Sequence, residues 1–413
     1  MKIRQWFRVL GPGLIAGAAD DDPAGIATYS VVGAQFGNAF LWSAFATWPL
    51  MACAQMTCAR VGLVSGAGLG RAIRNKLPRW VGAVLALALF AANAINIAAD
   101  LAGMGEAMSL MRCGPAMLYV AIFGIALAVL GVRLPYATIA KFLKWLALAL
   151  VAYAIAAFLA RPDWSQVARD VFSPSLPKDR DGWEALVAIL GTTISPYLFY
   201  WQAGQEIEEQ KDDGKTSEAE RSNASHREIV ERRQDVAAGT LASNAVMFFI
   251  VLTASVTLHA HGTTHIETTK QAAEALRPVA GNAAFLIFSI GLVGTGLLAI
   301  PTLAGSAAYA FAETFDWRYG LNERFRRAVP FYAVYVAAIA GGVVLNLAGM
   351  SAVRALVWSS VVNGLLAPVV LVVLLFVITD TKLMKGQASP WIAVVLVALT
   401  ALLMAGAGVA MFV

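Results

Sequence analysis

Apolar stretches about twenty residues long recur along the whole chain, and short segments rich in charge, proline and glycine separate them. As a helix, each stretch could cross the roughly 30 Å of hydrocarbon in a bilayer. The chain lacks the alternating rhythm of about ten residues that marks an outer-membrane barrel. The pattern therefore predicts an all-α polytopic membrane protein with eleven spans, at residues 10–32, 39–60, 81–105, 116–132, 142–160, 183–204, 235–258, 281–312, 329–346, 354–378 and 390–412.

Composition and charge agree with this interpretation. Hydrophobic residues make up 59% of the 413 residues and charged residues only 14%, whereas soluble domains carry about 25% charged residues. With the N-terminus inside, about three quarters of the Lys and Arg residues fall in cytoplasmic segments, as the positive-inside rule requires. The net charge of +5 then needs no nucleic-acid partner. We expect a prokaryotic cytoplasmic (inner) membrane, a cytoplasmic N-terminus, a lipid bilayer around the chain and no obligatory protein partner.

The first apolar stretch contains three consecutive carboxylates, Asp20, Asp21 and Asp22, and then Pro23 and Gly25. A carboxylate that faces lipid at the bilayer centre costs several kcal/mol. Proline lacks the N–H that would continue the helix, and its ring clashes with the preceding turn. Unwound backbone survives at membrane depth only where it lines a cavity or is buried in protein. The stretch therefore predicts a discontinuous helix whose carbonyls and carboxylates face an internal site.

A second interruption, GTTISPYLFYWQ at residues 191–202, lies near the middle of the sixth span. Two unrelated proline kinks are the simpler alternative, but the acidic run makes simple kinking a poor account of the first span. Five spans separate the two interrupted helices, which is the spacing of the first helices of two inverted five-helix repeats. We expect one transmembrane transporter domain over 1–413, with a first repeat at 1–160, a second repeat at 183–378 and an extra eleventh helix at 390–412.

One polar insert interrupts the apolar pattern, at residues 205–234. It mixes both charge signs and has few apolar residues, which is typical of a solvated connector. We expect a cytoplasmic charged linker made of a helical extension followed by a flexible segment.

The oxygen-rich character of the two interruptions indicates the kind of ion they suit. Carboxylates, hydroxyls and free carbonyls are ligands for hard divalent cations such as Mg²⁺, Ca²⁺ and Mn²⁺. Neither interruption contains the Cys, Met or His that a soft-metal site would use. We expect the metal as transported substrate and no cofactor. The loop after the seventh span could collect metal at three histidines, although an incidental occurrence is the simpler interpretation: His259, His261 and His265.

The stretch GPGLIAGAADDDPAGIAT, residues 11–28, resembles the first helix of the Nramp divalent-metal transporters, whose signature there is Asp-Pro-Gly-Asn. The second interruption resembles their sixth helix, with its Met-Pro-His signature. AADLAG at 98–103 and SSVVNGLLAP at 359–368 extend the match over nearly the whole chain. The resemblance implies a LeuT-like fold with eleven transmembrane helices, two inverted repeats, and alternating access around a metal at broken helices 1 and 6.

The resemblance also implies a set of metal residues. The family's binding aspartate falls on Asp22, and its asparagine falls on Gly25, so one side-chain ligand is lost. The family's backbone carbonyl ligand falls on Thr192, and its methionine falls on Ser195, so the thioether is lost as well.

Further family positions suggest a gate, a supporting shell and a proton path. Asp100 keeps a family aspartate and is a candidate relic of a proton path, whereas Gly103 replaces a glutamate often found three residues on. The candidates for a gate or for support of the site are Asp20, Asp21, Tyr197 (a histidine in the family), Ser360 (a glutamine in the family) and Asn363.

These departures resemble the Nramp-related magnesium transporter branch more than the ordinary Mn²⁺/Fe²⁺ branch. Methionine sulfur favours softer transition metals, so its loss removes that preference. Smaller side chains leave room for water, and Mg²⁺ usually keeps several waters. Fewer titratable groups on the proton route predict weak or absent proton coupling. The expected function is secondary-type import of divalent cations, Mg²⁺ first and also Mn²⁺, by alternating access.

Other functions predict different residues. A proton-coupled Mn²⁺/Fe²⁺ importer of the ordinary Nramp type is the first alternative, and Gly25, Ser195 and Tyr197 argue against it. An organic-solute symporter on the same fold is the second, and the acidic run would repel a substrate carboxylate. An intramembrane aspartyl protease would need facing carboxylates such as Asp22 and Asp100. A protease would leave the five-span spacing of the two interrupted helices unexplained, so we do not expect an enzyme.

Overall fold

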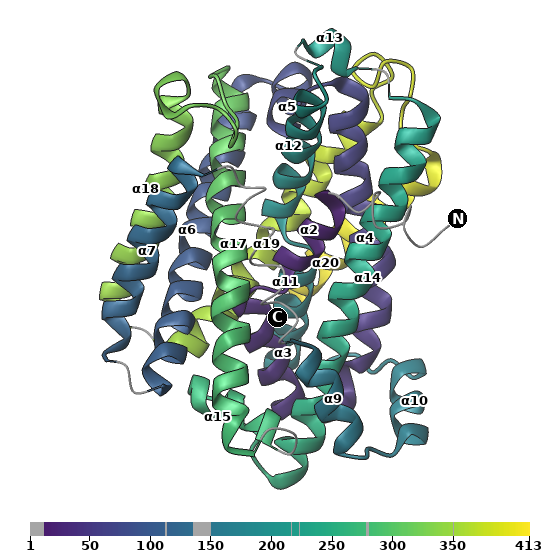
Figure 1. Ribbon diagram of the computed structural model, residues 1–413. Coiled ribbons are helices and arrows are strands. Elements are labelled where there is room, and N and C mark those ends of the chain that lie inside the picture. Colours follow the sequence, from purple (N-terminus) through teal and green to yellow (C-terminus); the bar gives the residue numbers. More distant parts are fainter. Residues whose placement is uncertain are drawn as a thin grey trace.

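The computed structural model describes residues 12–111, 114–134, 150–215, 217–222, 224–277, 281–349 and 351–413. These segments form helices and turns, and no β-strand occurs in them. Long helices run between the two ends of the molecule, and the short helices α2 and α3 lie among them near the centre (Figure 1). The predicted all-α class is confirmed.

The helices of the first part of the chain begin with the two pieces of the first interrupted span. These are α2 (Pro12–Asp20) and α3 (Pro23–Phe36), and the short η1 (Gly37–Phe40) joins α3 to the next helix. The others are α4 (Leu41–Ser65), α5 (Leu69–Lys76), α6 (Arg79–Leu110), α7 (Ala116–Arg133), α9 (Val151–Leu159) and α10 (Trp164–Phe172).

The second part begins with the two pieces of the sixth span, α11 (Arg180–Thr193) and α12 (Pro196–Asp212). The longer helices that follow are α14 (His226–Thr257), α17 (Ala284–Phe315), α18 (Val329–Leu345), α19 (Ala352–Ile378) and α20 (Trp391–Ala410). The short connecting helices are α13 (Glu218–Arg221), η3 (His259–His261), α15 (Thr269–Ala273), η4 (Glu274–Leu276), η5 (Gly281–Ala283), η6 (Phe325–Arg327) and η7 (Asn346–Ala348).

The predicted spans coincide with these helices or helix pairs, with end shifts of up to about nine residues. Residues 142–149 of the fifth span lie outside the described residues. Seven described helices are long and apolar enough to cross a membrane alone, and a bent pair that joins Pro23–Ser65 to Leu69–Lys76 would add an eighth. The helices α2, α11 and α12 are too short to cross alone, at 9, 14 and 17 residues, because the interruptions divide their spans.

The interrupted helices are enclosed by other helices. α2 packs along α14, and α3 packs against α14, α19, α11 and α6. α12 lies against α4 and α17. As a result, Asp20, Asp21 and Asp22 are at most 5% exposed. The carboxylates therefore face protein and not lipid, as the cost of burying charge in hydrocarbon demands.

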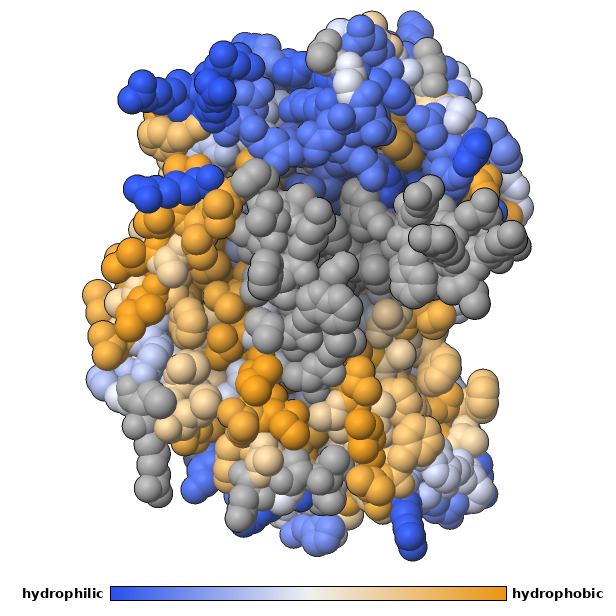
Figure 2. All heavy atoms as spheres, in the orientation of Figure 1, coloured by the Kyte–Doolittle hydropathy of each residue, from blue (hydrophilic) through white to orange (hydrophobic). Residues whose placement is uncertain are grey.

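Hydrophilic residues gather at the end of the molecule that carries α5, α13 and the end of α12, and a largely apolar band lies below it (Figure 2). A bilayer requires such a band on the outer surface of a spanning protein. We call this end the connector end, because it carries the charged insert.

The charged insert is more helical than its composition suggests. α12 continues to Asp212, which is the expected helical extension, and α14 already begins at His226. Ser225 caps α14 by accepting the Glu228 N–H, and the Glu228 side chain accepts the Ser225 N–H in return. This capping box removes two unsatisfied donors at the helix start. The non-helical part of the insert is therefore short.

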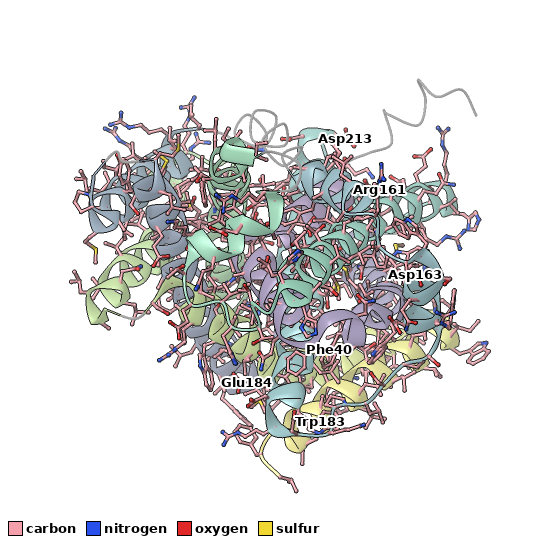
Figure 3. The ribbon with its side chains drawn as sticks, turned by 90° about the horizontal axis from the view of Figure 1, so that it is seen from below. Phe40, Arg161, Asp163, Trp183, Glu184 and Asp213 are labelled. Carbon is pink, nitrogen blue, oxygen red and sulfur yellow. The ribbon has the colours of Figure 1, made fainter. Side chains whose placement is uncertain are left out.

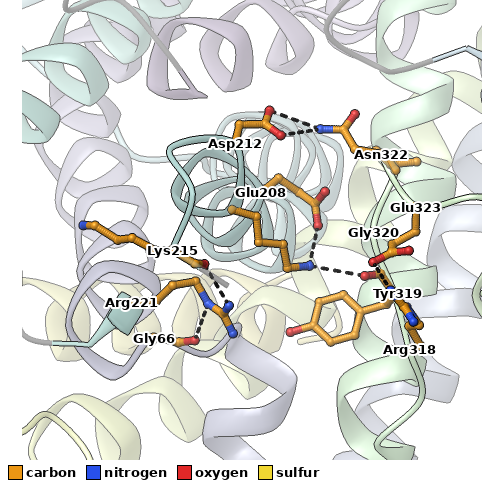
Figure 4. A network of polar contacts seen from close by, with 12 residues as sticks. Gly66, Glu208, Asp212, Lys215, Arg221, Arg318, Tyr319, Gly320, Asn322 and Glu323 are labelled. Carbon is orange, nitrogen blue, oxygen red and sulfur yellow. Dashed lines mark hydrogen bonds and ion pairs between the residues drawn. The ribbon is translucent and has the colours of Figure 1, made fainter. Parts of the chain in front are cut away.

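Polar contacts tie the insert to neighbouring segments (Figure 4). Lys211 donates to the Glu208 carboxylate at 3.1 Å and to the Tyr319 carbonyl at 3.3 Å, which joins α12 to the segment after α17. Arg221 donates to the carbonyl of Gly66, at the end of α4. The insert thus packs on the helix ends around it.

The turn between α19 and α20 is tied to α5 in a similar way. The Lys76 ammonium lies 2.6 Å from the Asp380 carboxylate. This hydrogen bond lowers the pKa of Asp380 to about 2, and backbone N–H groups that also donate to Asp380 assist it.

Candidate metal-binding site

Asp22 closes the first interruption and starts α3. It is the N-cap residue of α3, and its Oδ1 accepts the Gly25 N–H at 2.6 Å. Pro23 takes the first helical position, where a missing N–H costs no hydrogen bond. The end of α2 has carbonyls without an N–H partner in their own helix, and the start of α3 presents N–H groups at the same place. The predicted break in the first helix is confirmed.

Ser195 holds the equivalent place in the second interruption. α11 ends at Thr193, and Ser195 is the N-cap residue of α12. The Ser195 hydroxyl does not cap α12, because it donates back to the carbonyls of Gly191 at 2.8 Å and Thr192 at 3.0 Å. A carbonyl has two lone pairs, so the Thr192 oxygen keeps capacity for another partner.

The two interruptions meet. A Cβ placed on Gly25 would lie 3.0 Å from the Thr192 Oγ1 and 3.4 Å from the Asp22 Oδ1. Tyr197 also crosses between them, since its hydroxyl donates to the Ala19 carbonyl at the end of α2 at 3.1 Å. Three of the implied metal residues, Asp22, Gly25 and Thr192, therefore lie together, and no larger residue fits at position 25 without a shift.

Asn96 is the side-chain partner of Asp22. It reaches from α6 and donates to the Asp22 Oδ2 at 3.1 Å. Asp100 lies one turn further along α6 and is fully buried, and neither of its carboxylate oxygens makes a well-formed hydrogen bond in the described part of the chain. A buried carboxylate needs a donor or a positive partner, and the backbone N–H of Ala24 beside the interruption interacts with Asp100.

Asp20 and Asp21 face a different element. Both approach the Ser243 hydroxyl of α14, at 2.7 Å and 3.1 Å. One hydroxyl carries one hydrogen, so Ser243 serves only one carboxylate at a time. The two residues therefore support the break from the α14 side and are not directed at the same point as Asp22.

Ser360 and Thr28 form a contact on the side of the site away from the connector end (Figure 1). Their hydroxyl oxygens lie 3.0 Å apart and join α19 to α3. Asn363 lies one turn along α19, and its amide oxygen is buried with no hydrogen-bond partner among the described residues. All three side chains are buried.

The three histidines of the outer loop do not converge. The Nδ1 atoms of His259 and His261 lie 2.8 Å from the carbonyls of Ala34 and Thr257. Throughout the described segments, no three His, Cys, Asp or Glu side chains are grouped so that they could hold a metal ion by themselves. An ion at the interruptions would therefore depend on backbone oxygens, hydroxyls and water in addition to Asp22.

On the connector end, close packing covers the site. A Cβ on Gly17 of α2 would lie 2.4 Å from the Gly239 carbonyl of α14. The Asp235 carboxylate accepts the Gly13 N–H at 2.8 Å and contacts Arg232 at 2.7 Å. α2 and α14 thus touch backbone to backbone.

Arg232 joins this contact to α12. Its guanidinium also pairs with Glu206 at 2.8 Å and with Glu209. Arg232 and Glu206 are both buried. The arginine thus links the start of α14 to the end of α12.

Sequence reasoning missed three contacts of this site. It did not predict the hydrogen bond from Asn96 to Asp22. It assigned nothing to Ser243 or Thr28, because isolated hydroxyl residues are common in membrane helices and carry no pattern. The one available signal was that Asn96 lies a single turn before an intramembrane acid.

Comparison with known proteins was made by sequence and by structure. A sequence model of the family described as Nramp, natural resistance-associated macrophage protein-like, matches residues 13–413. The divalent metal cation transporter MntH of Yersinia pestis (strain Pestoides F) is 27% identical over 398 residues, which cover 92% of this chain and 88% of that protein. MntH of Brucella suis biovar 1 (strain 1330) is 27% identical over 409 residues, covering 95% and 85%.

Two solved structures share the architecture. The crystal structure of the Eremococcus coleocola manganese transporter in complex with an aromatic bis-isothiourea substituted compound matches with a TM-score of 0.73 at 17% identity, over 99% of this chain and 88% of that one. Mhp1, a nucleobase-cation-symport-1 family transporter in a closed conformation, matches with a TM-score of 0.56 at 14% identity, over 98% and 91%. The predicted LeuT-like fold is confirmed.

Proposed function

The chain belongs to the Nramp family, and from this premise we propose that it is a divalent metal cation transporter that imports Mg²⁺ first, and also Mn²⁺, by alternating access. The observation that carries the proposal is the meeting of the two interruptions at Asp22, Gly25 and Thr192. The relatives named above are transporters, so the chain is not an enzyme. The bacterial relatives also favour an inner-membrane location, and the excess of Lys and Arg in the segments expected inside favours a cytoplasmic connector end.

The proposed ligands are oxygen atoms. The Asp22 carboxylate supplies the charge, and the Thr192 carbonyl and the Ser195 hydroxyl supply neutral oxygens. Gly25 has no side chain, which lets the backbone of α3 lie against Thr192. Water completes the shell, because no three His, Cys, Asp or Glu side chains converge in the described residues. Asn96 orients Asp22 through its hydrogen bond.

Magnesium fits this set better than a softer metal does. Mg²⁺ dehydrates reluctantly and usually keeps several waters, so few direct ligands are sufficient. A thioether ligand would favour a transition metal, and Ser195 provides a hydroxyl instead. Mn²⁺ shares the preference for carboxylate, carbonyl and water, which is why the proposal includes it.

Weak or absent proton coupling is part of the proposal. Tyr197 stands where the family has histidine, and its hydroxyl is engaged by the Ala19 carbonyl. Without protons, the membrane potential supplies the drive. Moving a divalent ion inward at 100 mV is worth about 4.6 kcal/mol, which corresponds to a concentration ratio of roughly a thousandfold or more.

The arrangement of the helices supports alternating access. On the side away from the connector end, cavities lined by α3, α11 and α19 reach Thr28. On the connector end, α2 and α14 are packed backbone to backbone. We interpret this state as closed to the cytoplasm, with an outer cavity that reaches Thr28 but not the interruptions.

A proton-coupled Mn²⁺/Fe²⁺ importer is the second candidate. The observation in its favour is Asp100, a fully buried carboxylate without a well-formed hydrogen bond in the described residues. Such a group could take up and release a proton near Asp22.

Metal uptake into proteoliposomes tests the proposed site. Asp22→Asn keeps the shape of the side chain and removes its charge, so we expect Mg²⁺ uptake to fall at least tenfold. Asp213→Asn changes an exposed aspartate of the connector and should leave uptake unchanged. Equal uptake by wild type and Asp22→Asn would overturn the site. Uptake of Mn²⁺ but not of Mg²⁺, with acidification of the vesicle interior, would favour the second candidate.

A further inference from the structure

Two adjoining cavities occupy the end of the molecule away from the connector. Their volumes are about 450 Å³ and about 520 Å³. They share the residues Val31, Glu184, Arg354 and Val357, so together they form one depression, which we call the outer vestibule. It lies between α3, α11 and α19.

The outer vestibule leads toward the metal site along α3. Thr28 lines its inner part and is hydrogen-bonded to Ser360. Asp22 lies six residues before Thr28 on the same helix, which is about 9 Å at the helical rise. An ion that comes along α3 from this side would therefore meet the vestibule before the interruptions.

The charges of the vestibule are unequal. Three carboxylates line it, from Asp181 and Glu184 on α11 and from Glu267 in the outer loop. One cationic side chain, Arg354 at the start of α19, lines both cavities. In the described chain, no carboxylate lies within ion-pair distance of Arg354, which is exposed. Its charge therefore acts on the vestibule as a whole.

A path for ions must attract them and also release them. Three carboxylates around a divalent cation, with nothing to oppose them, would hold it and slow its passage. We propose that Arg354 is a specificity-determining residue of the outer vestibule, which opposes its carboxylates so that divalent cations enter without being retained. This inference rests on the proposed function, because it assigns the vestibule to the same ions.

The expected size of the effect follows from Coulomb's law. One charge about 8 Å from a divalent ion in water changes its local concentration roughly fivefold. Salt screens this interaction, since the Debye length falls from about 30 Å at 0.01 M to about 3 Å at 1 M. The interaction energy of Arg354 with a monovalent ion is half that with a divalent ion, so the effect depends on the valence of the ion.

Initial rates of Mn²⁺ and Mg²⁺ uptake test the assignment in proteoliposomes at 0.01 M and 1 M ionic strength. We expect Arg354→Gln to lower KM about fivefold at low ionic strength without raising kcat, and Glu184→Gln to raise KM. Arg354→Lys keeps the charge and should behave like wild type. A KM for Arg354→Gln within twofold of wild type at 0.01 M, or a shift that persists at 1 M, would overturn the proposal.

Arg161 provides a matched control. It lies between α9 and α10 at the same end of the molecule and does not line the vestibule, and it stands well apart from Glu184 in the view from below (Figure 3). Arg161→Gln removes one positive charge from the same end of the molecule but leaves the vestibule unchanged. We therefore expect it to have the same KM as wild type. A KM change equal to that of Arg354→Gln would mean that overall charge, not the vestibule, is responsible.

A second readout does not depend on transport. A nitroxide attached at Gln35→Cys, in a variant whose Cys53, Cys58 and Cys113 are serine, would report the local Mn²⁺ concentration through its relaxation rate, since Gln35 lines the vestibule. Arg354→Gln should increase this relaxation several-fold at 0.01 M. An unchanged relaxation would contradict the inference even if transport is observed. If wild type carries no divalent cation while the relaxation rises as expected, the proposed function fails and the vestibule assignment stands.

Discussion

At the scale of single residues, the site depends on two small residues, Gly25 and Ser195. Gly25 has Thr192 and Asp22 directly beside it. The Ser195 hydroxyl donates its hydrogen to the carbonyls at the end of α11. The structure thus has a glycine and a hydroxyl at the positions where the resemblance to the family implies an amide and a thioether. We therefore expect the residues at positions 25 and 195 to determine which metal ion the site prefers.

Restoring the two lost side chains tests this view. In Gly25→Asn with Ser195→Met, the new amide and thioether should raise the preference for Mn²⁺ over Mg²⁺ at least tenfold, because sulfur favours softer metals. Competition between the two ions for uptake would measure it. Ser30→Ala changes a hydroxyl that bonds to the Ile26 carbonyl of its own helix and to Tyr153, and to neither interruption, so it should leave the preference unchanged. A double variant with wild-type preference would show that the selectivity lies elsewhere.

Single residues also show which parts of the site could be predicted from the sequence and which could not. Asp22, Gly25 and Thr192 could be named in advance for two reasons. A proline and a carboxylate in an apolar span predict a break that faces an internal site, and the resemblance to the Nramp family implies which residues lie there. The partner of Asp22 could not, because Asn96 lies on a helix distant in sequence and its rotation about the helix axis follows from packing. The same reason explains why Ser243 was missed as the partner of Asp20 and Asp21.

At the scale of elements, the apolar periods predicted nearly every helix, but not the extent of those that leave the membrane. α14 begins nine residues before the predicted span, because the polar start of the helix carries its own capping box. The charged insert therefore contains more helix than its composition indicates. Hydropathy indicates the apolar, membrane-spanning part of a helix but gives no information about a polar extension outside the membrane.

The contact between α2 and α14 is the element-scale feature with the clearest consequence. Gly13 and Gly17 allow the two helices to touch through their backbones. Arg232 and Asp235 hold the start of α2 at the same place. We expect this contact to form the closed state of the cytoplasmic side.

A bulky residue at Gly17 should prevent this closure. A Cβ there would lie 2.4 Å from a carbonyl oxygen of α14, so Gly17→Leu must push α2 away, at a cost of about 1–3 kcal/mol. Mg²⁺ uptake should fall at least tenfold, while Mn²⁺ binding to the purified protein persists. Gly406→Leu is the matched control, because a Cβ on that helical glycine meets nothing within 4 Å. Normal uptake by Gly17→Leu would show that closure does not need the contact.

At the scale of the whole molecule, the two ends have different tasks. One end holds a charged vestibule that leads along α3 toward the interruptions, and the other is sealed by α2, α12 and α14. The carboxylates at the interruptions are shielded from lipid by the surrounding helices. The account requires that a divalent cation passes between these ends, driven by the membrane potential and without protons.

The most direct test is to record Mg²⁺ and pH inside proteoliposomes together, while a potassium gradient with valinomycin sets the potential. The account predicts saturable Mg²⁺ entry that rises as the interior becomes more negative, no acidification, and no response to an imposed pH gradient. Loss of this entry in Asp22→Asn would place the ion at the interruptions. Entry that requires an inward proton gradient and acidifies the interior, or entry of Mn²⁺ alone, would contradict the account.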